Sequence, residues 1–280
     1  MALKTVLRHF FFFLLLTLNY LVTWGQIQEL TSPDGRLTVR VDTGVNLKWK
    51  ALLNEEEILQ NVEIGMDLDG NRSLGWNTRL KSAETKFKDE LIEPVIPNKD
   101  KTIKSRYNEM TLRMAGKYSV IFRAYNDGVA YRFIDFSKNT KSIESEKMRI
   151  QFPQGTTAYF PKEESMYSHN ERIYLKQKAD DFEKGDFCSL PVMFDTGAGK
   201  VLITEASLHD YPGLFLEYRE NMDFESVFPK FVLEAIPDEE DDTLDLRAEQ
   251  AALVHRALDE ISTAHSEVLI LCYVEALSYE

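Results

Sequence analysis

Two short segments of this chain place imidazole, carboxylate and aromatic side chains close together. The first runs from Tyr167 to Tyr174 and contains His169 and Glu171. Aromatic rings offer apolar faces with a polar edge, and polar neighbours bind hydroxyl groups, so this mixture is typical of a carbohydrate-binding loop. The alternative is an ordinary surface loop in which the aromatic residues serve as anchors.

The second segment is His209-Asp210-Tyr211, which follows Glu205 in the sequence and is expected to line the same surface as that residue. Adjacent polar residues of this type are often simply part of a turn, and that interpretation stays open. We take His169, Glu171, His209 and Asp210 as the candidates for contact with a sugar.

Neither segment provides a complete catalytic centre. Glycoside hydrolysis needs two facing carboxyl groups, about 5–5.5 Å or about 6.5–9.5 Å apart. The acidic pairs Glu163-Glu164 and Asp180-Asp181 are adjacent in sequence, and neighbours on a strand point to opposite faces. The sequence also contains no nucleophile elbow, P-loop or zinc-binding histidine pair. We therefore expect no self-sufficient active site.

The composition is that of a folded, acidic protein. Of the 280 residues, 44% are hydrophobic and 11% aromatic, which excludes a disordered chain. The net charge of −13 argues against nonspecific nucleic-acid binding, which needs excess Lys and Arg. The two cysteines, Cys188 and Cys272, are expected to be idle thiols, although a disulfide between them stays open.

The N-terminus is typical of an export signal. Lys4 and Arg8 precede an apolar run over residues 10–22, which is short for a membrane span. Thr23 and Gly25 suit the small-residue positions before a cleavage site, so residues 1–25 are expected to be a signal peptide. A periplasmic or secreted protein follows; the alternative is an N-terminal membrane anchor.

From residue 28 onward, apolar residues recur at every second position. This period predicts strands with one buried face, and turn sequences such as Asn126-Asp127-Gly128 separate them. We predict a mainly β protein, a large antiparallel β-sandwich, over residues 26–234, with residues 81–104 as a long mobile connection. The alternating sets include Leu37, Val39 and Val41; Met110, Leu112 and Met114; Val129, Tyr131 and Phe133; and Met148, Ile150 and Phe152.

Four motifs in order refine this prediction: residues 32–37 (SPDGRL), 107–109 (YNE), 122–133 (FRAYNDGVAYRF) and 202–213 (LITEASLHDYPG). Together they resemble the N-terminal domain of glycoside hydrolase family 97, over residues 27–234. The resemblance implies a β-super-sandwich that packs against a catalytic (β/α)8 barrel, and activity on α-glucosides or α-galactosides. We expect the barrel to be missing from this chain, which would then be a non-catalytic accessory domain that binds an α-linked oligosaccharide.

The resemblance also implies a metal-binding residue. Glu205, in the "ITEA" part of the fourth motif, matches a glutamate that helps to hold calcium in this family. Ca²⁺ takes six to eight oxygen ligands, so the remaining ligands would come from the barrel. The alternative is a glutamate at a strand end with a local lysine or backbone partner.

The last forty residues have a different character. Residues 235–243 form an acidic linker, and apolar residues at three- and four-residue steps predict an amphipathic helix over residues 244–260. Val268, Leu269 and Cys272 are expected to line a second helix.

Residues 244–280 resemble the start of region four of extracytoplasmic-function sigma factors. The recognition helix that would enter the major groove is absent from these residues, and the segment is not basic, so no nucleic acid is expected as a partner. Three interpretations stay open: a sigma-like transcription protein, a generic two-helix tail, or a chimeric reading frame.

Overall fold

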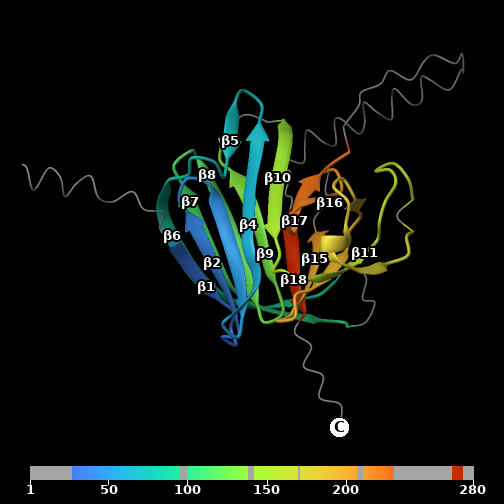
Figure 1. Ribbon diagram of the computed structural model, residues 1–280. Helices are drawn as coiled ribbons and strands as arrows, with labels where there is room; N and C mark the ends of the chain where they lie inside the picture. Colours follow the sequence, from blue (N-terminus) through green and yellow to red (C-terminus); the bar gives the residue numbers. More distant parts are fainter. Residues whose placement is uncertain are drawn as a thin grey trace, which may run out of the picture.

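The computed structural model describes residues 27–94, 100–137, 142–169, 171–206, 211–229 and 267–273. Almost all of their regular structure is β-strand, in two antiparallel sheets packed face to face (Figure 1). The mainly β fold and the antiparallel sandwich predicted from the alternation are therefore confirmed. Within these ranges the helical structure is η1 (Ala179–Asp181), a single 3-10 turn, and no helix is long and apolar enough to cross a membrane.

The first sheet combines early and late parts of the chain. Its strands, in spatial order, are β1 (Ile27–Thr31), β2 (Leu37–Thr43), β3 (Leu47–Leu53), β4 (Glu56–Leu68), β10 (Ile143–Gln151), β17 (Asp223–Val227), β16 (Phe215–Glu220) and β13 (Phe187–Cys188), with β5 (Arg72–Leu74) paired to β4.

The second sheet is equally wide. In spatial order it contains β12 (Leu175–Lys178), β11 (Thr157–Phe160), β14 (Val192–Asp195), β15 (Lys200–Ala206), β18 (Glu267–Tyr273), β9 (Val129–Asp135), β8 (Tyr118–Tyr125), β7 (Ile103–Met114) and β6 (Leu80–Ile92). The hairpin predicted at Asn126-Asp127-Gly128 joins β8 to β9, and the Tyr125 amide donates to the Gly128 carbonyl across 2.8 Å.

The alternating apolar residues of both sheets meet in one core. Trp49 of β3 packs edge-on against Phe122 and Tyr131 of the opposite sheet, with ring centroids 5.9 Å and 6.1 Å away. Cys188 is a free, buried thiol in this core, and burial raises its pKa far above the usual range. The structure therefore agrees with an inert cysteine at this position.

The prediction of a long connection over residues 81–104 was wrong. β6 and β7 instead form a hairpin, and residues 103–106 of β7 extend beyond the end of β8. β6 is the edge strand of its sheet, and nearly all of it is solvent-exposed on both faces. Because both faces of β6 are solvent-exposed, its sequence does not alternate between apolar and polar residues. Its charged residues, which discourage an edge strand from pairing with another chain, resemble those of a loop.

The prediction of a second C-terminal helix was also wrong. Residues 267–273 form β18, which pairs with β15 on one side and β9 on the other. In Figure 1 this red strand lies in the middle of its sheet. A short uninterrupted apolar run suits a central strand as well as a helix, so its spacing could not decide between them. Residues 1–25, 235–243 and 244–260, with the signal peptide, linker and first helix expected there, lie outside the described residues.

Candidate functional site

A buried carboxylate anchors the loop that contains His169 and Glu171. Glu163 has no exposed side-chain surface, and its two oxygens accept hydrogen bonds from Ser189 Oγ (2.9 Å) and Arg172 Nε (2.7 Å). Arg172 also donates to Ser168 Oγ across 2.9 Å. The Glu163 carboxylate raises the pKa of Arg172, so the guanidinium remains charged in the pair. The loop is therefore fixed at its base by a charge-assisted network.

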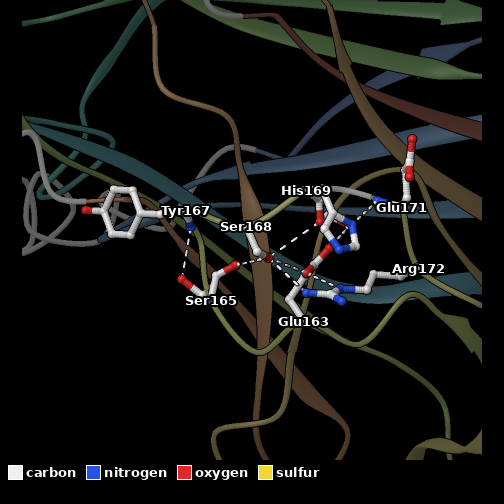
Figure 2. Close-up of polar contacts among 8 residues, drawn as sticks. Glu163, Ser165, Tyr167, Ser168, His169, Glu171 and Arg172 are labelled. Atoms are coloured by element: carbon white, nitrogen blue, oxygen red, sulfur yellow. Dashed lines mark hydrogen bonds and ion pairs between the residues drawn. The ribbon is translucent and has the colours of Figure 1, made fainter.

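Above this base the candidate sugar-binding side chains face solvent. Figure 2 shows Ser168 and Arg172 converging on Glu163, whereas Tyr167 and Glu171 point away from the cluster. His169 and Glu171 are exposed, and the Glu171 amide donates to His169 Nδ1 across 3.3 Å. The structure thus brings these two predicted residues onto one turn.

Apolar side chains on the same loop are unusually exposed. Tyr167 is 72% and Ile173 85% accessible, and Tyr174 is about half accessible although its hydroxyl donates to the Pro191 carbonyl across 2.7 Å. An exposed apolar surface of this kind beside hydrogen-bonding groups is typical of an interaction site.

Glu205 lies at the end of β15, on the same face as the buried Val201 and Ile203. Its Oε1 accepts a hydrogen bond of 2.9 Å from the Leu214 amide. Glu205 therefore has the local backbone partner that the alternative interpretation predicts. Partial burial raises the pKa of this carboxyl.

A second carboxylate from the opposite sheet faces the same end of the core. Glu146 of β10 is only 7% exposed because it continues the inward row of Met148 and Ile150. Tyr211 Oη donates a hydrogen bond to Glu146 Oε2. Burial raises the pKa of Glu146 to about 7, and the nearby Glu205 adds to the rise.

The central strand β18 sets the spacing between Glu205 and Tyr131. Val268 pairs with Glu205 on one side and with Tyr131 on the other, so all three positions share one cross-strand row. The Tyr131 hydroxyl is buried and accepts or donates no hydrogen bond within the described part of the chain. The end of the sandwich therefore holds a polar group made up of Glu146, Glu205, Tyr131 and Tyr211.

The anchored loop and this polar group are joined through β13 and β16. The Glu163 amide donates to the Phe187 carbonyl on β13, whose neighbour Cys188 pairs with Leu216 on β16. Leu214, the partner of Glu205, directly precedes β16. The candidates His209 and Asp210 lie outside the described residues, so their place beside Glu205 stays a prediction.

The described residues do not form a metal site of their own. Within those ranges, no group of three or more His, Cys, Asp or Glu side chains lies close enough together to hold an ion. Ca²⁺ requires at least six oxygens, and Glu205 provides at most two. A calcium ion at Glu205 would therefore need ligands from elsewhere.

Comparison with known proteins places this fold in a family. The model of the glycosyl-hydrolase 97 N-terminal domain matches residues 30–250, which is most of the chain. The chain belongs to this family. This glycosyl-hydrolase 97 N-terminal domain is 34% identical over 220 residues to a retaining alpha-galactosidase of Bacteroides thetaiotaomicron, covering 75% of the chain and 33% of that protein.

Solved structures share the fold of the domain. A glycoside hydrolase family 97 enzyme from Pseudoalteromonas sp. strain K8, in complex with acarbose, superposes with a TM-score of 0.63 at 18% identity, covering 72% of this chain and 32% of the other. A beta-arabinopyranosidase superposes with a TM-score of 0.65 at 18% identity, covering 88% and 40%. The chain spans about one third of the length of the relatives described first.

Sequence reasoning missed Glu163, Arg172 and Glu146 as organising residues. Glu163 was noted only as half of an acidic pair, and its burial depends on the fold. Glu146 had a usable signal: it stands two residues before Met148 and four before Ile150, in the period of an inward-facing row.

Proposed function

We propose that this chain is the non-catalytic, sugar-facing β-sandwich of a family 97 glycoside hydrolase that acts on α-linked oligosaccharides. The observation that carries this proposal is the exposed Tyr167–His169–Glu171 surface, held on the buried Glu163–Arg172 pair in a domain of this family. A fixed loop lowers the entropy cost of binding a flexible ligand.

The proposal includes a missing partner domain. The relatives are about three times as long as the matched region, and one is described as a retaining alpha-galactosidase. We propose that the catalytic carboxylates belong to a (β/α)8 barrel that packs against this sandwich, and that Glu205 supplies one carboxylate to a calcium ion whose other ligands come from that barrel. Removal of residues 1–25 on export to the periplasm or medium belongs to the same proposal.

A titration of the chain with panose tests sugar binding, because a related enzyme was solved in complex with panose. We expect a weak interaction, with a Kd of about 1 mM, or about −4 kcal/mol, followed by NMR shifts at residues 167–175. Parallel titrations with an α-galactosyl disaccharide and with each sugar plus Ca²⁺ identify the preferred glycoside and any metal dependence.

A matched pair of variants localises the binding. Tyr167→Ala removes an exposed ring from the loop, whereas Phe87→Ala removes a ring that is 53% exposed on β6, at the opposite edge of the second sheet from β12. We expect binding to weaken only in Tyr167→Ala. No sugar-dependent shift at residues 167–175 at any concentration would overturn the proposal.

The sigma-like alternative is not favoured. It needs helices in residues 244–280, and β18 places residues 267–273 inside the sandwich instead.

A further inference from the structure

The buried Glu146 carboxylate and the half-buried Glu205 carboxylate belong to different sheets and are linked by one short segment. Glu146 comes from β10 of the first sheet, and Glu205 from β15 of the second. Residues 211–214 pass between them: Tyr211 donates to Glu146, and the Leu214 amide donates to Glu205 across 2.9 Å. The segment therefore carries one hydrogen bond to each sheet.

The backbone of this segment lies directly against the Glu205 carboxylate. A Cβ built on Gly213 would come within 3.6 Å of Glu205 Oε1, with no closer neighbour. Tyr211 is held further by its ring, which packs edge-on against Phe228 with centroids 6.2 Å apart. Movement of Tyr211 would thus carry the Leu214 amide away from Glu205.

No described neighbour replaces the bond between Tyr211 and Glu146. Two other hydroxyls lie near Glu146. Ser226 Oγ donates to the Glu146 backbone carbonyl across 3.1 Å, and Tyr131 forms no hydrogen bond within the described residues. A buried acceptor that is hydrogen-bonded holds its partner firmly, because breaking the bond leaves an unsatisfied group in the core.

We propose that Glu146 is a positioning residue for Glu205: through Tyr211 it fixes residues 211–214, so that the Leu214 amide orients the Glu205 carboxylate. Oε1 accepts the hydrogen bond from the Leu214 amide, and Oε2 accepts no hydrogen bond from the described residues. This inference deepens the proposed function and depends on it for the role of Glu205 as a calcium ligand. Carboxylates that bind a metal ion are commonly oriented by hydrogen bonds from neighbouring groups.

Amide hydrogen exchange at Leu214 in the 280-residue chain tests the proposal without any metal or sugar. We expect Tyr211→Phe and Glu146→Leu to speed exchange at Leu214 by about tenfold or more, since the amide loses its fixed acceptor geometry. The amides of Met148 and Ile203, in the adjoining strands, should keep their protection.

Glu146→Gln is the control that separates positioning from general stability. Its side-chain carbonyl still accepts the Tyr211 hydroxyl, so Leu214 exchange should stay within about threefold of the parent chain. Unchanged Leu214 exchange in Tyr211→Phe, or equal acceleration at Met148 and Ile203, would overturn the inference. Sugar binding is measured separately, from the NMR shifts of residues 167–175. If no sugar binds but Leu214 exchange changes in the variants as expected, the proposed function is overturned and the positioning of Glu205 is not.

Discussion

Arg72 and Asp135 form a two-pronged ion pair that joins the sheets of the sandwich. Arg72 of β5 donates from Nη1 to Asp135 Oδ2 (2.5 Å) and from Nη2 to Oδ1 (2.7 Å), and Asp135 ends β9 in the opposite sheet. Burial alone would raise the pKa of Asp135, but hydrogen bonds from Arg72 and Ser137 lower it to about 2.

This lowered pKa predicts a loss of stability in acid. The folded pKa of Asp135 lies below its ordinary value of 3.8, so its contribution is present above that value and is lost as pH falls towards 2. Allowing for solvent screening, we expect about 1 kcal/mol. The free energy of unfolding in urea, measured between pH 2 and 5, should depend less on pH in Asp135→Asn than in the parent chain. Asp89→Asn, on the exposed β6, should leave the pH dependence unchanged.

Glu146 predicts a pH dependence of the opposite sign. Its pKa is raised from 4.5 to about 7, so the folded state binds more protons than the unfolded state in this window, and stability falls as pH rises through it. The full effect is about 3 kcal/mol. Glu146→Gln should flatten most of the decline, and a smaller slope of the same sign should remain from Glu205. A decline equal to that of the parent chain would contradict the raised pKa.

The base of the Tyr167–Tyr174 loop predicts a large cost for losing Glu163. Glu163→Ala leaves the buried Ser189 hydroxyl without its acceptor and opens a small void, so the free energy of unfolding should fall by about 3 kcal/mol. Chemical denaturation measures this change. Glu29→Ala removes the acidic partner of Arg40 in an exposed pair and should leave the midpoint almost unchanged. Similar effects of the two variants would show that the loop is not anchored through Glu163.

The central place of β18 predicts intolerance to proline. Ile270→Pro removes an amide from a strand paired on both sides, and we expect thermal unfolding about 6–12 °C lower, the shift caused by a loss of about 3 kcal/mol in a domain of this size. Ile27→Pro, at the first residue of the edge strand β1, is the control and should unfold nearly as the parent does. Tolerance at position 270 would exclude β18 from the sheet.

Sequence patterns were sufficient for strands with one wet face. Leu37, Val39 and Val41 are completely buried, as their spacing predicts. The patterns failed where a strand does not have one buried and one solvent-exposed face. β6 is solvent-exposed on both faces, and β18 is an unbroken apolar run. In both cases the environment comes from neighbours far away in sequence, which a local pattern does not contain.

The candidate site was predicted only in part. The residue types of the Tyr167–Tyr174 segment can be read from the sequence, and the structure shows that its apolar side chains are exposed; contact with a sugar stays a prediction. The residues that hold it are not: Glu163 meets Ser189 only after two strands and a 3-10 turn have intervened, and Glu146 meets Tyr211 across a separation of 65 residues. Local residue types indicate what a loop can touch, and tertiary contacts decide how firmly it is held.

The position of β18 also sets the order of assembly. β9 and β15 precede residues 267–273 in the chain, and until these residues are in place each of the two strands has an open side where β18 will lie. Pairing Tyr131 with Val268 closes a loop of more than a hundred residues, which is a slow step with aggregation-prone strand edges exposed meanwhile. The folding chain is therefore most exposed to aggregation just before its second sheet is completed.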